Sequence, residues 1–257
     1  MQATDLDLLT QAARRSGDIA MGYFGQSPEI WDKPDDAGPV TAADLAVNIM
    51  LEQTLQAARP TYGWLSEETE DDTARLTKDT VFVVDPIDGT RAFINGTKDW
   101  SHSLAIVHHG QVTAAAVYVP LRDLMFTATK GGGAFLNGAP ITPTNCTDIP
   151  AATILTHKAN SQGKFWKAGV FPDMQIAFRS SLAYRLCLVA DGSFDAMITL
   201  RPTWEWDVAA GTLILSEAGG TATTQRGDIT RFNNPHPQLD GLVAAGGVHA
   251  PLMSLLA

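Results

Sequence analysis

The first sixty residues carry apolar side chains at the spacing of amphipathic α-helices. Across residues 6–24, apolar positions recur every three, four or seven residues, and Thr4 with Asp7 can form a capping box at the start. A second helix is predicted over residues 41–59, because a proline follows and ends it. A loop rich in Asp, Pro and Gly, residues 32–40, lies between the two helices.

Short apolar runs replace the helical pattern in the rest of the first half. Runs of this kind, bounded by Gly and Pro, are typical of β-strands. They predict strands at residues 62–65, 81–84, 103–109, 112–119, 124–129 and 134–136. The polar stretch 69–79 is predicted to be a loop. Two helices followed by a largely antiparallel sheet indicate an α+β arrangement.

In the second half, short apolar strands alternate with helical segments, as in an α/β layer. Strands are predicted at residues 153–156, 175–178, 195–200 and 242–245, and helices at residues 161–168, 181–190, 206–218 and 248–256. A boundary is predicted near residues 140–150, where prolines gather. It divides the chain into an α+β subdomain, residues 1–145, and an α/β subdomain, residues 146–257.

Composition limits the possible partners and location of the protein. The 257 residues are 45% hydrophobic, which is enough for one large domain or two small ones. A formal net charge of −10 argues against binding to nucleic acid or to an anionic membrane. The two cysteines do not form a Cys-x-x-Cys pair, and no apolar run approaches the roughly 18 residues of a membrane span. We therefore expect a soluble cytoplasmic protein.

Carboxylates gather at the predicted ends of strands and starts of helices. Asp85 and Asp88 follow a buried strand, Glu67 ends a shorter one, and Asp44 and Asp207 lie at helix starts. Binding and catalytic residues often come together at such ends. Carboxylates that meet there repel one another unless a cation lies between them. An all-oxygen ligand set favours Mg²⁺, Mn²⁺ or Ca²⁺, and paired metals suit phosphoryl chemistry.

Each of these carboxylates also has an ordinary structural explanation. Asp88 is followed by Gly, which is a common turn, and Asp85 is followed by Pro, which is a common strand exit. Asp44 stands three residues after Thr41, which fits a capping box. Asp207 fits the first turn of a helix, where acidic residues are favourable, and Glu67 with Glu68 fits a solvated acidic pair. Spacing alone leaves both interpretations open.

Four segments considered together resemble the inositol monophosphatase superfamily of metal-dependent, typically lithium-sensitive phosphatases. They are residues 38–44 (GPVTAAD), 64–69 (WLSEET), 85–90 (DPIDGT) and 206–211 (WDVAAG). The resemblance covers nearly the whole chain. It implies a layered α/β/α/β/α sandwich of the inositol monophosphatase and fructose-1,6-bisphosphatase type, with the site between the halves and frequently a homodimer. Ser66 is a departure, since many members carry Gly there.

The resemblance implies a set of metal ligands. The side chains of Glu67, Asp85, Asp88 and Asp207 and the carbonyl oxygen of Ile87 would hold two or three Mg²⁺ ions, with Mn²⁺ as a possible substitute. Most of these ligands lie in the predicted first subdomain. The substrate would be a small phosphorylated metabolite, and the reaction would be hydrolysis of its phosphate ester by a metal-activated water.

The resemblance also implies catalytic and phosphate-binding roles. Thr90 and Asp44, together with Glu67, would orient and activate the attacking water. The backbone of Gly89 and Thr90 would hold the phosphate at the start of a helix, where free N–H groups and the helix dipole favour an anion. These roles define the reaction without defining the molecule that carries the phosphate.

Three substrates are compatible with the motifs. Residues 180–190 and the Trp-Asp segment are most similar to bisphosphate nucleotidases, so 3'-phosphoadenosine 5'-phosphate is the preferred substrate. Arg201 and Trp204 are the predicted nucleotide contacts. Inositol monophosphate is the first alternative, although residues 198–202 lack the Glu that inositol-specific members usually carry. Histidinol phosphate is the second, because residues 88–94 also resemble histidinol-phosphate phosphatases.

Two other functions are weaker alternatives. Phosphatases that form an aspartyl-phosphate generally use an Asp-x-Asp pair, whereas Asp85 and Asp88 are three residues apart. A non-catalytic protein that only binds metal or phosphate would not need the water-activating pair Thr90 and Asp44. Both features favour a hydrolase that acts without a covalent intermediate.

Overall fold

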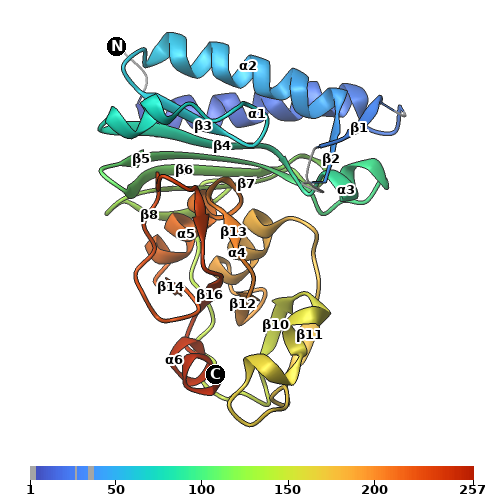
Figure 1. Ribbon diagram of the computed structural model, residues 1–257, viewed down its shortest axis with the longest axis vertical. Coiled ribbons are helices and arrows are strands. Elements are labelled where there is room, and N and C mark those ends of the chain that lie inside the picture. Colours follow the sequence, from blue (N-terminus) through green and yellow to red (C-terminus); the bar gives the residue numbers. More distant parts are fainter. Residues whose placement is uncertain (1–3, 27, 34–37) are drawn as a thin grey trace.

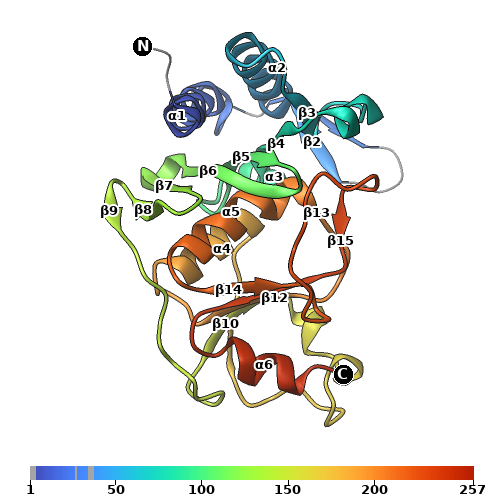
Figure 2. The same cartoon turned by 90° about the vertical axis from the view of Figure 1, so that its left-hand side faces the viewer.

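The computed structural model describes residues 4–26, 28–33 and 38–257. Figures 1 and 2 show five layers, in the order helices, sheet, helices, sheet and helix. This is the predicted α/β/α/β/α sandwich. Part of the loop predicted over residues 32–40 lies outside the described residues. Within the described residues, no helix combines the length and the apolar character that crossing a membrane requires.

The outer layer consists of α1 (Asp5–Tyr23) and α2 (Ala42–Ala58), which pack side by side on one face of the large sheet. Both helices begin with a capping box, from Thr4 to Asp7 and from Thr41 to Asp44. Each box satisfies backbone N–H groups that a helix start leaves unpaired. The inward faces of the two helices are buried in one cluster with apolar residues of the sheet.

The large sheet has seven strands in the order β3-β4-β5-β6-β7-β8-β9. Only β3 and β4 are parallel, and the other pairs are antiparallel. The strands are β3 (Gly63–Ser66), β4 (Thr80–Asp88), β5 (Ser101–His108), β6 (Gln111–Val119), β7 (Leu124–Thr129), β8 (Gly133–Leu136) and β9 (Ala139–Pro140). A separate short ribbon pairs β1 (Ile30–Asp32) with β2 (Pro39–Thr41). The segment predicted as a loop over residues 69–79 contains a 3-10 helix, Thr73–Thr77.

The second half supplies the three remaining layers. Helices α4 (Leu182–Ala190) and α5 (Glu205–Glu217) lie between the two sheets, and α6 (His249–Leu255) covers the outer face of the small sheet. The small sheet has the order β11-β10-β12-β16-β14. Its strands are β10 (Thr153–Thr156), β11 (Gln175–Ala177), β12 (Ala196–Thr199), β14 (Thr221–Thr223) and β16 (Leu242–Ala245). A short ribbon pairs β13 (Thr203–Trp204) with β15 (Gln238–Leu239).

The helix predicted over residues 161–168 is wrong. The segment contains two 3-10 turns, Lys158–Ser161 and Gly163–Phe165, instead of an α-helix. Glycine weakens a helix interior, and a Cβ atom at Gly163 would lie 2.0 Å from the carbonyl oxygen of Gly169. This close backbone approach holds the segment in a compact turn rather than in a helix.

The two predicted subdomains meet in one shared core. Every residue of α4 is buried, because the helix touches a sheet on each side and α5 along its length. Gly211 lies against Leu186, where a Cβ atom would approach the Leu186 Cβ atom to 2.6 Å. The Gly of the WDVAAG segment therefore allows α4 and α5 to pack closely, which places the start of α5 under the large sheet.

Candidate active site

Strand β4 ends in an irregular turn that presents two carboxylates. Asp85 pairs with Ser103 of β5 and Asp88 with Ser101, so two residues of β4 stand opposite one residue of β5. An extra residue of this kind forms a β-bulge, which bends a strand and redirects its side chains. Proline suits the position, because it has no N–H group to lose from the ladder. The bulge brings both carboxylates into one electrostatically linked group.

Three of the predicted ligands meet directly. Carboxylate oxygens of Glu67, Asp85 and Asp207 all lie within 4.8 Å of one another. Both Asp85 oxygens are buried and have no hydrogen-bond partner among the described residues. Buried carboxylates without partners are costly, and oxygen ligands are those that Mg²⁺ and Ca²⁺ prefer. The arrangement therefore fits one or more hard divalent cations.

Burial and mutual repulsion shift the acidity of this cluster. Burial, followed by the charges of neighbouring carboxylates, raises the pKa of Asp85 and of Asp207 well above the usual range. Burial raises the pKa of Asp88 to about 6 and that of Glu68 to about 7. Cations bound between these groups would compete with protons and favour the charged forms.

Asp88 is tied to the second half of the chain. Its Oδ2 atom accepts hydrogen bonds from the Ser181 hydroxyl at 2.6 Å and from the Ala183 N–H group at 2.7 Å. Ser181 is also the N-cap of α4. The carboxylate thus joins the β4 turn to the start of α4 as well as lying beside the three meeting ligands.

Lys33 provides a positive charge at the acidic cluster. Its Nζ atom lies 2.7 Å from an oxygen of Glu67 and 2.7 Å from an oxygen of Glu68. Burial disfavours the ammonium, but the two carboxylates outweigh burial and raise the pKa of Lys33. The contact offsets part of the negative charge around the cluster.

Asp44 combines a capping role with a place in the site. Its Oδ2 atom accepts hydrogen bonds from the Thr41 N–H group at 2.9 Å and from the Thr41 hydroxyl at 2.5 Å. The Thr90 hydroxyl donates to the other oxygen of Asp44 at 3.2 Å and to the Ile87 carbonyl at 3.1 Å. Burial raises the pKa of Asp44 to about 6. The capping explanation and the predicted Thr90–Asp44 pair are therefore compatible.

Gly89 is required by the backbone of the turn. It has a φ of 98° and precedes the short helix α3 (Thr90–Ile94). A Cβ atom there would lie 3.2 Å from the Asp99 carbonyl oxygen, so a side chain would be strained in conformation and space. Gly89 and Thr90, the predicted phosphate contacts, both line the cleft.

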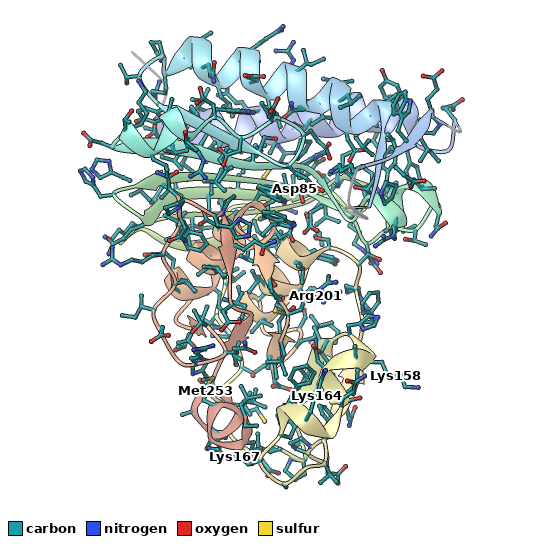
Figure 3. All side chains as sticks on the ribbon, viewed as in Figure 1. Asp85, Lys158, Lys164, Lys167, Arg201 and Met253 are labelled. Atoms are coloured by element: carbon teal, nitrogen blue, oxygen red, sulfur yellow. The ribbon has the colours of Figure 1, made fainter. Side chains whose placement is uncertain are left out.

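The four predicted carboxylate ligands line a cleft of about 690 Å³ between the two halves. Figure 3 shows Asp85 where the large sheet meets the inner helices, with Arg201 and Lys164 on the second half. Among the described residues, the acidic side chains that line the cleft are all predicted ligands. The cationic lining residues are Arg91, Lys164, Arg185 and Arg201. The cleft therefore combines the acidic cluster with cationic side chains, and Arg185 and Arg201 lie close enough to affect Asp88 and Asp207 electrostatically.

Trp204 lies apart from the cleft lining, in contrast to Arg201. Its ring stacks on Trp206 with the ring centroids 4.7 Å apart and the planes 9° apart, and it also contacts His236. Arg201 is exposed and lines the cleft. The structure thus brings only one of the two predicted nucleotide contacts to the site, because the two tryptophans pack on each other.

Comparison with known proteins identifies the fold and the family. The model of the inositol monophosphatase family matches residues 1–256. The chain belongs to this family. Nus factor SuhB of Xylella fastidiosa is 30% identical over 95% of this chain and 90% of its own length. Inositol-1-monophosphatase of Rhizobium meliloti is 32% identical over 86% of each chain. A Thermotoga maritima IMPase has a TM-score of 0.82 at 26% identity, covering 96% of this chain and 94% of its own.

Members of the inositol monophosphatase family are metal-dependent phosphatases, which supports phosphoric monoester hydrolysis by this chain.

Several residues at the site were not predicted from the sequence. Lys33, Ser181, Arg185, His157 and Phe178 all lie in or beside the cleft. One signal was available, because Arg185 is the single charge in an otherwise apolar helix segment.

His102 supports the ligand-bearing turn from behind. It is fully buried on β5, and its Nδ1–H group donates a hydrogen bond to the carbonyl of Pro86, between two predicted ligands. Burial lowers the pKa of His102 to about 4, so the ring is neutral at pH 7. Trp100 packs edge-on against the ring, with the centroids 5.5 Å apart.

Replacing His102 with Phe should loosen this turn, because an aromatic ring is kept while the Pro86 carbonyl loses its N–H donor. A buried carbonyl without a partner costs about 1–3 kcal/mol of unfolding free energy. We expect roughly 10- to 100-fold weaker Mg²⁺ activation, as for other residues that orient metal ligands. Denaturant unfolding and Mg²⁺ titration of activity measure the two effects. His102→Gln, which keeps a donor, should recover part of both, and unchanged Mg²⁺ dependence in His102→Phe would contradict the role.

Proposed function

We propose that this chain is a Mg²⁺-dependent phosphomonoesterase whose substrate carries a second anionic group, best represented by 3'-phosphoadenosine 5'-phosphate. The observation that supports it is the mixed charge of the cleft. It holds the acidic cluster, in which both Asp85 oxygens are buried without a partner among the described residues, and an adjoining cationic wall formed by Lys164, Arg185 and Arg201. A metal site beside a cationic wall suits a molecule with one phosphate at the metals and another anion opposite.

The residues of the acidic wall fit the roles that the family resemblance implies. Glu67, Asp85 and Asp207 would hold Mg²⁺, joined by Asp88 and the Ile87 carbonyl. Bound divalent cations lower the pKa of water and stabilise charge on the phosphate oxygens. The Thr90 hydroxyl is held by two acceptors, which fixes it where a water could be oriented. Asp44, which is hydrogen-bonded to Thr90, would accept the proton of that water, and Glu67 would help to orient the water.

The cationic wall supports one of the three candidate substrates over the others. Arg185 is buried, and its Nε–H group donates to the Arg179 carbonyl at 2.6 Å, so its position is fixed. Burial lowers the pKa of Arg185 to about 10, which leaves the guanidinium charged at pH 7. Arg201 lies close enough to affect it electrostatically. Two such cations favour a bisphosphate and oppose histidinol phosphate, whose amino group is cationic.

Inositol monophosphate is the second candidate. The supporting observation is that relatives of 30–32% identity carry the name inositol monophosphatase. One feature of the cleft favours it less, because inositol monophosphate has no second anion for the arginines. We also propose two or three Mg²⁺ ions per site with Mn²⁺ as a substitute, a homodimer and a cytoplasmic location.

The substrate proposal is tested by measuring Mg²⁺-dependent phosphate release from 3'-phosphoadenosine 5'-phosphate, inositol 1-phosphate and histidinol phosphate in parallel. We expect the highest kcat/KM for the bisphosphate. Arg201→Gln should lower kcat/KM for the bisphosphate roughly 10- to 100-fold, since it removes a charge-assisted contact. Inositol 1-phosphate, which lacks the second anion, should respond much less.

Arg226→Gln is the matched control, because Arg226 is an exposed arginine of the second half that does not line this cleft. It should leave the ranking of the three substrates as it is. A higher kcat/KM for inositol 1-phosphate than for the bisphosphate would overturn the substrate proposal and keep the phosphatase. No Mg²⁺-dependent phosphate release from any of the three would argue against the proposed reaction itself.

A further inference from the structure

We infer that Phe178, with His157 beside it, forms a stacking shelf for a planar ring of the substrate. The inference rests on the proposed function, because it places a second part of the same substrate in the same cleft. The shelf defines the substrate class more narrowly than the positive charges of the cleft do. It selects a phosphate ester that carries an aromatic heterocycle, as a nucleotide does, over one built on an aliphatic ring or chain.

Phe178 is an exposed aromatic side chain in a charged cleft. It lines the cleft directly after the edge strand β11, and 48% of it is exposed. One face of its ring is covered by Arg185, whose guanidinium carbon lies 4.6 Å from the ring centroid. Because Arg185 itself is buried, this face is closed. The exposed half of the ring is therefore the part that a ligand can reach.

His157 bounds the shelf on one side. Its ring meets Phe178 edge-on, with the centroids 5.9 Å apart and the planes at 73°. The Ala159 N–H group donates to Nδ1 of His157 at 3.1 Å, which fixes the orientation of the imidazole. Both rings line the cleft, His157 directly after β10 and Phe178 directly after the neighbouring parallel strand β11. The pair thus presents an aromatic surface within the cleft.

The chemistry of this surface matches a flat π-system. Aromatic rings attract one another in offset stacks at centroid distances of about 4.5–7 Å. A nucleobase can stack on either face, and alanine replacement of such a platform commonly weakens binding roughly tenfold to a hundredfold. Arg185 contributes twice, since it supports the ring of Phe178 and lies near the position proposed for the second phosphate. A nucleotide would place its phosphates and its base on adjoining parts of one wall.

The test compares two inhibitors that differ by the base. AMP and ribose 5-phosphate both carry a 5'-phosphate on ribose, but only AMP has the adenine ring. Their inhibition constants are measured with the full-length enzyme, Mg²⁺ and whichever phosphate ester it hydrolyses fastest. In the wild type we expect AMP to bind at least about tenfold more tightly. Phe178→Ala should reduce this ratio to near one, and Phe178→Trp should restore it.

Ile176→Ala is the matched control, since Ile176 is a similarly exposed apolar residue on β11 that does not line the cleft. It should keep the wild-type ratio. A wild-type ratio near one, or a ratio that survives Phe178→Ala, would overturn the shelf. The readout is separate from the choice of physiological substrate, because any hydrolysed phosphate ester serves as the reporter. Failure of the bisphosphate as a substrate therefore leaves this test intact.

Discussion

Replacing Asp85 with Asn is expected to abolish Mg²⁺-dependent phosphate release and, at the same time, to stabilise the metal-free protein. Asp85 is central to the acidic cluster, and both its oxygens are buried without a partner among the described residues. Asn keeps the shape but removes the charge that a divalent cation needs. We expect a loss of about a thousandfold or more, beyond the 10- to 100-fold cost of removing a residue that only orients ligands.

Asp85→Asn should stabilise the metal-free protein although it abolishes activity. The reason is that the metal-free wild type holds an uncompensated charge at Asp85. Burial and neighbouring carboxylates raise the pKa of Asp85, which means that its ionised form is unfavourable in the folded protein. A neutral amide costs less to bury than a carboxylate. In a chelating buffer at pH 8 the gain in unfolding free energy should be on the order of 1–3 kcal/mol. Thermal or denaturant unfolding measures it.

Asp79→Asn is the control, since the Asp79 side chain is 79% exposed and its charge is therefore not buried. It should change neither activity nor stability appreciably. An active Asp85→Asn enzyme would eliminate this residue as a metal ligand. A metal-free variant less stable than the wild type would show that Asp85 is mainly structural. Asp88→Asn is a less specific test, because Asp88 also accepts two hydrogen bonds at the start of α4.

Three of the predicted metal ligands can be located in the sequence because their positions follow from local geometry. Asp85 and Asp88 follow one strand, and Asp207 lies in the first turn of the helix that follows β13. A strand end and a helix start can be located from apolar periodicity and turn residues. The resemblance then indicated that Glu67 belongs with them. The oxygens of Glu67, Asp85 and Asp207 come within 4.8 Å of one another only through the tertiary fold, which local sequence patterns do not predict.

The residues that sequence missed depend on contacts between distant segments. Phe178 reaches the cleft because β11 is the edge strand of the small sheet, beside β10. An apolar run in the sequence predicts a strand, but it predicts neither the order of the strands nor which strand lies at the edge. Lys33, which follows β1, forms an ion pair with Glu67, which follows β3. Trp204 lies apart from the cleft lining for a local reason, since its ring stacks on the neighbouring Trp206. Arg201 and Trp204 are close in the sequence, but only Arg201 lines the cleft.

Mg²⁺ binding should weaken as the pH falls from 8 to 6, and the metal-free protein should become more stable over the same range. Burial raises the pKa of Asp44 and of Asp88 to about 6 and that of Glu68 to about 7. In the unfolded chain these groups titrate near pH 4. Between about pH 4 and 7 the folded state therefore binds more protons than the unfolded state. Its unfolding free energy falls as the pH rises through that window.

Mg²⁺ reverses this trend because it binds the deprotonated carboxylates of the folded state. Protons compete at low pH, so we expect the apparent Kd for Mg²⁺ to be at least about tenfold higher at pH 6 than at pH 8, with at least one proton displaced per ion. The rise in Tm on adding Mg²⁺ should be largest at pH 8. Calorimetric titration and thermal unfolding, with and without chelator, measure the two quantities. Asp85→Asn should have a smaller pH dependence, and a Tm shift independent of pH would contradict proton–metal competition at this cluster.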